Sequence, residues 1–214
     1  MGVAGLDSAI MKPTALALNI LVAAIGTWQY ARAGRFSWEA FYPFAVLGFP
    51  FSFIGGAIDL PGSLYYPIVG AILLFAAFQT ARSVIVKRQV EVSDISPPLI
   101  PALLTGAGIG FVSGMTGTGG GIFLAPILII TGWVGMRRAA AVTAAYNLLN
   151  SAAALAGSYA SLKMLPSNLP LWMCVTGIGA IFGSAIGSRY VPERGLRSIL
   201  AILVLGSGAK LLFS

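Results

Sequence analysis

The sequence predicts an all-α membrane protein with about six transmembrane helices, arranged as two inverted three-helix repeats plus a glycine-rich re-entrant helical hairpin. Hydrophobic residues make up 57% of the 214 residues and charged residues only 9%, whereas soluble domains carry about 25% charged residues. The apolar residues gather in runs of about 20, the length that a helix needs to cross a bilayer. Five glycines lie within residues 114–121, in the longest apolar region.

The apolar runs define the expected spans and divide the chain into two parts. The only long polar linker is "VKRQVEVSDISPP", which begins at residue 86. We therefore expect a first repeat over residues 1–86, a cytoplasmic linker over 87–98 and a second repeat over 99–214. The predicted spans are residues 13–31, 39–58, 64–86, 138–161, 168–188 and 196–213.

Positive charges distinguish two arrangements of residues 99–132, which contain the glycines. Cytoplasmic loops carry an excess of Lys and Arg. If this segment enters and leaves on one side of the membrane, ten of the thirteen Lys and Arg lie on that side, and Lys12, Lys163 and Lys210 lie on the other. If the segment crosses the membrane once, the two sides carry seven and six of these residues. The charges thus predict a re-entrant hairpin whose two arms are shorter than a span, with the ten-charge face in the cytoplasm. The ten residues are Arg32, Arg35, Arg82, Lys87, Arg88, Arg137, Arg138, Arg189, Arg194 and Arg197.

The two parts of the chain resemble each other. "ALNILVAAIGTWQYARAG" places Gly26 seven residues after Asn19, and "LLNSAAALAGSYASLK" places Gly157 seven residues after Asn150. A re-entrant hairpin between the parts makes their first spans run in opposite directions, so the repeats are inverted, a recurring transporter design. The alternative is that transmembrane helices rich in small residues resemble one another without any repeat.

The glycine stretch is a candidate anion site. Glycine is a poor helix former, and non-helical backbone at membrane depth must line a cavity or be buried in protein. A helix starting at about Ile122 would present free amide N–H groups with a partial positive charge. The predicted site comprises Thr116, Gly117, Thr118, Gly119, Gly120 and Gly121, in which the threonines would add hydroxyl donors or cap the helix. The alternative is close helix packing through small residues, which "GAGIG" (106–110) fits better. The stretch matches no nucleotide-binding motif.

Polar residues inside predicted spans complete the candidate site. Asn19, Asn147 and Asn150 lie within spans, and helical spacing puts Asn147 and Asn150 on one face with Thr143 and Ser151. Such a stripe usually faces a water-filled path or the bundle interior. Hydrogen bonding between helices is the alternative role.

Several classes of function are disfavoured. The chain has no His and a single Cys, so we expect no metal site, no cofactor and no disulfide within the chain. No pair of acids lies at the predicted midplane, which argues against an enzyme. The net charge of +7 is scattered between apolar runs, a pattern of membrane topology rather than of nucleic-acid binding.

The segment "GFVSGMTGTGGGIFLAPILIITGW" resembles the glycine-rich signature of the TauE/SafE sulfite-exporter family of bacterial and archaeal membrane proteins. "RRAAAVTAAYNLLNSAAALAGS" and "IFGSAIGSRY" support the resemblance, which covers nearly the whole chain. It implies transport of a small sulfur-containing anion such as sulfite, a sulfonate or sulfoacetate. The family pattern has a glycine-rich segment in each half, and "MGVAGLDSAI" looks like the tail of the first. We therefore expect a first repeat without its N-terminal hairpin, through truncation, a misplaced start or real variation.

The leading hypothesis is a transporter or exporter of a small anion in the inner or plasma membrane, working by alternating access. The alternatives are a channel-like anion pore that uses the same glycines as a filter, and a truncated, non-transporting membrane scaffold. The expected partners are a small inorganic or organosulfur anion and membrane lipid, and not nucleic acid; a homo-oligomer is left open.

The re-entrant hairpin makes a testable prediction about sidedness. Cysteines introduced singly at Lys87 and Arg137 should react with an impermeant thiol reagent from the same side of the membrane. Labelling of the two positions from opposite sides would rule out the hairpin.

Overall fold

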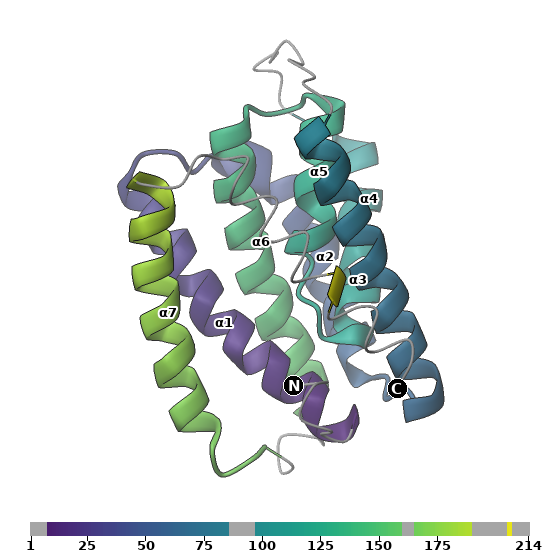
Figure 1. Cartoon of the computed structure of the whole chain (residues 1–214). Coiled ribbons are helices and arrows are strands. Elements are labelled where there is room, and N and C mark those ends of the chain that lie inside the picture. Colours follow the sequence, from purple (N-terminus) through teal and green to yellow (C-terminus); the bar gives the residue numbers. More distant parts are fainter. Residues whose placement is uncertain (1–7, 86–96, 160–164, 190–204, 207–214) are drawn as a thin grey trace.

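The computed structural model describes residues 8–85, 97–159, 165–189 and 205–206, and within them the chain forms seven helices (Figure 1). In the view of Figure 1, α7 and α1 lie at one side of the bundle, α6 in the middle, and α3 and α4 at the other side. The helices are α1 (Ser8–Arg32), α2 (Trp38–Ala57), α3 (Gly62–Ile85), α4 (Leu99–Thr116), α5 (Gly121–Thr131), α6 (Met136–Gly157) and α7 (Leu169–Arg189).

The length and hydropathy of these helices confirm an all-α membrane protein. Four of them, in α1, α2, α4 and α6, are long and apolar enough to cross a bilayer. Three of the four coincide with spans predicted from the sequence. The apolar parts of α3 and α7 are shorter, Gly62–Ala76 and Leu169–Phe182, and the predicted span 196–213 lies outside the described residues. The six-span layout and the inverted repeat therefore stay predictions.

Helix α2 packs directly against the backbone of α4. A Cβ atom built on any of three α4 glycines, spaced four residues apart, would overlap a backbone carbonyl oxygen of α2. Successive contacts advance by four residues in both helices, so α2 and α4 run parallel. The packing role predicted for the "GAGIG" segment is thus confirmed. The contacts are Gly106 with Phe44, Gly110 with Gly48, and Gly114 with Ser52.

Helix α2 makes the same kind of contact with α6. Gly56 of α2 faces the carbonyl of Ala154, and Gly157 of α6 faces the carbonyl of Phe53. The hydroxyl of Ser52 also donates to the carbonyl of Asn150, over 2.8 Å. Helix α2 therefore fixes the positions of α4 and α6 relative to each other.

Helices α4 and α5 form a helical hairpin joined by residues 117–120, named here the glycine turn. Gly121, at the start of α5, lies beside Thr143 and Asn147 of α6, yet α6 begins only five residues after α5 ends. Helix α5 must therefore run antiparallel to the first half of α6. Since α6 is parallel to α2, and α2 to α4, helix α5 returns toward the end of the bundle where α4 begins.

The two arms of the hairpin differ more in length than the sequence predicts. Helix α4 has 18 residues and is long enough to be a candidate span, whereas α5 has only 11. The prediction that both arms are shorter than a span is therefore wrong for α4. The parallel contact with α2 explains the difference, because it keeps α4 helical up to Thr116.

Two separate apolar clusters lie in the described part of the bundle. The larger unites α2, α4, α5 and α6 around the fully buried Phe44, Leu124, Leu128 and Tyr146. The smaller consists of Met11 of α1 with Tyr65 and Val69 of α3. The glycine turn lies where α1 meets the elements of the larger cluster.

The α4 glycines allow a matched stability test. Gly110→Ala should lower the free energy of unfolding by about 1–3 kcal/mol, because the new methyl group pushes α4 away from α2. Gly108→Ala should leave it unchanged or raise it by up to about 1 kcal/mol, since a Cβ there meets no atom within 4 Å. Thermal unfolding in detergent, followed by circular dichroism, measures both. Equal effects of the two substitutions would show that the α4 glycines are not needed for the close approach of α2 and α4.

Candidate functional site

The glycine turn has a backbone that other residues rarely adopt. Gly117 ends α4 in the left-handed conformation, with φ 72°, and its N–H donates to the carbonyl of Ser113 over 2.8 Å. Gly119 is also left-handed, with φ 70°. Side chains with a Cβ are strained in this conformation. The break in the helix predicted from the sequence is thus present, and α5 begins at Gly121, one residue before the predicted start.

Three asparagines from two helices surround the turn. A Cβ atom on Gly119 would overlap Oδ1 of Asn147 and would lie 2.8 Å from Nδ2 of Asn19. A Cβ atom on Gly120 would lie 2.6 Å from Nδ2 of Asn150. The structure therefore brings together five of the predicted site residues, and only glycine lets the turn approach the asparagines so closely.

The face of α6 toward the turn carries polar atoms without partners. Within the described part of the chain, four buried side-chain oxygens of α6 make no hydrogen bond. They are Oγ1 of Thr143, Oδ1 of Asn147, Oδ1 of Asn150 and Oγ of Ser151. We name these four residues the polar face of α6. Ser151 lies close to the turn, since its Oγ would be 3.0 Å from a Cβ on Gly119.

Unpartnered oxygens at these positions weaken the alternative role for the asparagines. A residue kept for hydrogen bonding between helices should have its polar atoms paired. Asn150 is 1% exposed; its Nδ2 donates to Oγ of Ser113 over 3.5 Å, while its Oδ1 has no partner. Each buried unsatisfied group costs about 1–3 kcal/mol. A fold that tolerates four of them on one helix face is typical of a site that a ligand or water completes.

The two threonines do not take one of the two roles that the sequence leaves open to them, that of capping the next helix. The Thr116 hydroxyl donates to the Val112 carbonyl over 2.8 Å, so in its 3.0 Å contact with Thr118 the Thr118 hydroxyl must be the donor. The prediction that a threonine caps the next helix is wrong, because the N-cap of α5 is Gly120 and has no side-chain cap. Both hydroxyls fasten the turn to the end of α4 instead.

The start of α5 offers fewer free amides than the sequence predicts. The N–H groups of Phe123 and Leu124 both donate to the carbonyl of Gly120, over 3.2 and 3.1 Å. The N–H of Gly121 donates to the carbonyl of Gly119. An anion at this helix start would therefore rely more on side-chain donors than on a row of amides.

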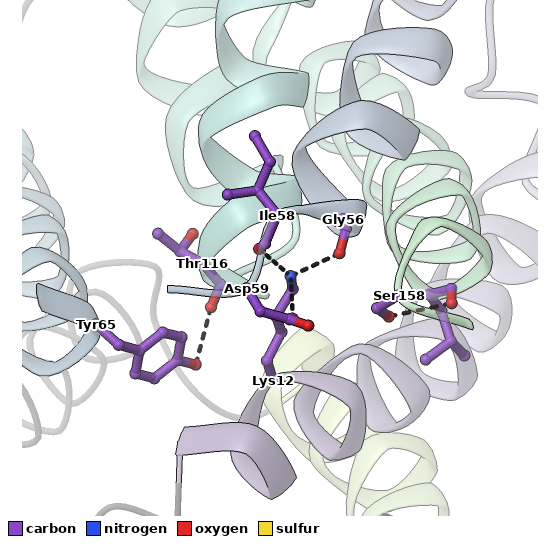
Figure 2. Close-up of polar contacts among 8 residues, drawn as sticks. Lys12, Gly56, Ile58, Asp59, Tyr65, Thr116 and Ser158 are labelled. Carbon is purple, nitrogen blue, oxygen red and sulfur yellow. Dashed lines mark hydrogen bonds and ion pairs between the residues drawn. The ribbon is translucent and has the colours of Figure 1, made fainter. Parts of the chain in front are cut away.

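Lys12 holds the turn from the side of α1, a role that sequence reasoning missed. Its Nζ donates to the carbonyls of Gly56 and Ile58, both over 2.7 Å, and lies 3.5 Å from Oδ1 of Asp59 (Figure 2). The Lys12 side chain is 4% exposed, against 66% for Asp59. The lysine thus stabilises the C-terminal end of α2, where unpaired carbonyls carry partial negative charge. The only sequence signal is an isolated lysine at the start of an apolar run.

The backbone of the same region is tied down from two further helices. The carbonyl and Cγ of Lys12 would lie 3.2 Å from a Cβ on Gly117, so α1 rests on the turn. The hydroxyl of Tyr65, in α3, donates to the carbonyl of Thr116 over 3.0 Å (Figure 2). The turn is therefore held by α1, α3 and α4 on one side and faces α6 on the other.

The chain matches the family model described as sulfite exporter TauE/SafE over residues 2–211. It belongs to the TauE/SafE sulfite exporter family. A probable membrane transporter protein of Sinorhizobium fredii is 49% identical to it over 214 residues, which are 100% of this chain and 87% of that relative. A probable membrane transporter protein of Methanocaldococcus jannaschii is 26% identical over 133 residues, 61% of this chain and 48% of that relative. No solved structure matches the chain significantly.

Family membership agrees with the architecture. The TauE/SafE match, the transporter relatives and the four apolar helices identify a multi-pass protein of the cell membrane. The glycine turn and the polar face of α6 both lie within the residues that match the TauE/SafE model.

The unpartnered oxygen of Asn147 makes a prediction about stability. Asn147→Leu should leave the thermal unfolding temperature unchanged or raise it, because an apolar side chain of similar shape removes a buried unsatisfied acceptor. Ser52→Ala is the comparison, since Ser52 makes a buried bond between helices; its loss should lower stability by about 1 kcal/mol. A fall for Asn147→Leu as large as that for Ser52→Ala would show that Asn147 holds helices together.

Proposed function

We propose that this chain transports a small sulfur oxyanion, sulfite or a related organosulfur anion, by alternating access, and that the glycine turn and the polar face of α6 bind it. The observation that carries the proposal is the set of buried, unpartnered side-chain oxygens on α6, two of which, Oδ1 of Asn147 and Oγ of Ser151, lie against a non-helical backbone segment. Family membership supplies the substrate class, because the matching model is described as a sulfite exporter.

The location of the site supports transport. Lipid cannot hydrogen-bond a broken backbone, so such a segment in a membrane protein is buried in protein or lines a cavity. Transporters place broken helices at their substrate sites for this reason. The side-chain groups beside the turn include hydrogen-bond donors that an oxyanion needs, namely Nδ2 of Asn19 and the hydroxyls of Thr143 and Ser151.

The membrane layout of the proposal follows the directions of the helices. Helix α5 returns toward the end of the bundle where α4 begins, which supports a re-entrant hairpin. Gly26 of α1 lies against Ala144 of α6, while Asn19 lies beside Gly119 next to Asn147 and Ser151. Helix α1 thus runs antiparallel to α6, as inverted repeats require. The complete proposal has six spans, 1–86 and 99–214 as the two repeats, and 87–98 as the cytoplasmic linker.

Flux measurements in proteoliposomes test this function. Radiolabelled sulfite should enter vesicles that contain the full chain, with a rate that saturates and is lowered by unlabelled sulfite. No flux above that of empty vesicles would overturn the substrate assignment. Flux that never saturates would overturn alternating access and indicate a channel-like pore.

The turn can be tested with a matched pair of glycine variants. Gly119→Ala should reduce sulfite flux at least tenfold, because its Cβ overlaps Asn147 and crowds Asn19 and because alanine is strained at this φ. Gly108→Ala, in open space on α4, should leave the flux unchanged. Equal flux in the two variants would show that the turn is a packing element.

A further inference from the structure

The unpartnered polar atoms at this site include two amide oxygens, which can only accept hydrogen bonds. Oδ1 of Asn147 and Oδ1 of Asn150 are buried and unpartnered. A fully ionised oxyanion carries acceptors alone on its oxygens. Placed against these two amide oxygens, it would leave both unsatisfied and would be repelled by their partial negative charges.

The local bonds show which amide atom of Asn150 is left without a partner. The Ser113 hydroxyl donates its hydrogen to the carbonyl of Gly110, over 3.2 Å. Its oxygen is therefore an acceptor for Nδ2 of Asn150, at 3.5 Å. Turning the Asn150 amide over would place two acceptors against each other. The free end of this side chain is consequently the carbonyl oxygen.

Around Gly119 the site combines an acceptor with donors. Oδ1 of Asn147, Nδ2 of Asn19 and Oγ of Ser151 all approach the same face of this glycine. A hydroxyl can both donate and accept. The set therefore complements the hydrogen-bonding groups of a ligand that has charged oxygens for the donors and one O–H group for an amide oxygen.

The charges near the turn oppose a doubly charged ligand. Among the described residues, Lys12 is the cation in contact with the turn, and it is already paired with Asp59 and two carbonyls. Three titratable groups on the helices around the site have contacts of their own: Arg32 is stacked on Trp28, Tyr65 is bonded to Thr116 and Tyr146 is bonded to Gly106. The others on these helices are Tyr30 of α1, Glu39 and Tyr42 of α2, Tyr66 and Arg82 of α3, and Arg137 and Arg138 of α6. Buried charge without a counter-charge is costly, and the cost grows with the square of the charge.

We infer that the site selects a singly charged oxyanion that still carries a proton, such as hydrogen sulfite, and rejects fully ionised anions such as sulfate and sulfonates. Asn147 and Asn150 are the specificity-determining residues, because their oxygens accept from the O–H group. This inference rests on the proposed function and narrows its substrate class.

Competition for sulfite flux tests the selectivity. In proteoliposomes with the full chain, a tenfold excess of sulfate or of methanesulfonate should leave radiolabelled sulfite flux unchanged, whereas unlabelled sulfite should suppress it. The total sulfite needed for half-maximal flux should rise about tenfold per pH unit above the second ionisation of sulfite, with little change in maximal rate. Cotransport of a proton would also make the flux depend on pH, but it would not prevent sulfate from binding. The competition result therefore separates recognition of the O–H group from proton cotransport.

Variants assign the selectivity to the asparagines. We expect sulfite to raise the unfolding temperature of the unmodified chain more than sulfate does. Asn147→Leu and Asn150→Leu should each abolish this difference and reduce sulfite flux at least tenfold. Asn168→Leu, in the loop before α7, should keep both properties. Retention of the sulfite preference in both site variants would overturn the assignment, even if their flux falls.

The possible failures are distinguishable. Absence of saturable sulfite flux at every pH would overturn the proposed function and this inference with it. Saturable sulfite flux that sulfate or methanesulfonate inhibits as strongly as unlabelled sulfite would overturn this inference alone. Half-saturation that is independent of pH would do the same.

Discussion

The candidate site depends on the backbone-to-backbone packing of α2 against α4 and α6. Glycines at 106, 110 and 114 bring α4 onto the carbonyls of α2, and Gly56 and Gly157 do the same between α2 and α6. Contacts at this distance fix the register, because no side chain can adjust to a shift. Helix α4 consequently ends beside the middle of α6, and the turn that follows it meets Asn147 and Asn150. A one-residue slip of α4 would move the turn away from both asparagines.

The site is built from features that lower stability. Left-handed backbone at Gly117 and Gly119, four unpartnered oxygens on α6 and a lysine taken out of water all oppose folding. The larger apolar cluster and the glycine contacts compensate for them. Sites that break local rules of sequence and structure are frequently functional, and here the violations concentrate in the few residues that link α1, the turn and α6.

The sequence predicts those parts of the structure that depend on local chemistry. The helix break follows from glycine's own conformational freedom, and helical spacing places Asn147 and Asn150 on one face. The hydrogen bonds of Thr116 and Thr118 could not be predicted, because the Val112 carbonyl accepts from Thr116, and Thr116 from Thr118, only in the folded turn. The role of Lys12 depends on carbonyls more than 40 residues away. The length of α4 likewise depends on its parallel contact with α2.

The packing also restricts how the proposed alternating access can occur. The tight contacts of α2 join the first half of the chain to α4 and α6 of the second half, so the two halves cannot rock against each other at that interface. The apolar residues divide differently: one cluster unites α2, α4, α5 and α6, and a separate one joins α1 to α3. The site lies between α6 and α1, with Asn147 and Asn150 on α6, Asn19 on α1 and the turn beside all three. Movement of α1 against the turn would change the distance from Asn19 to Gly119 while leaving the glycine contacts intact. For the proposed transport cycle, such a movement of α1 would also have to break the bonds from Lys12 to the carbonyls of Gly56 and Ile58.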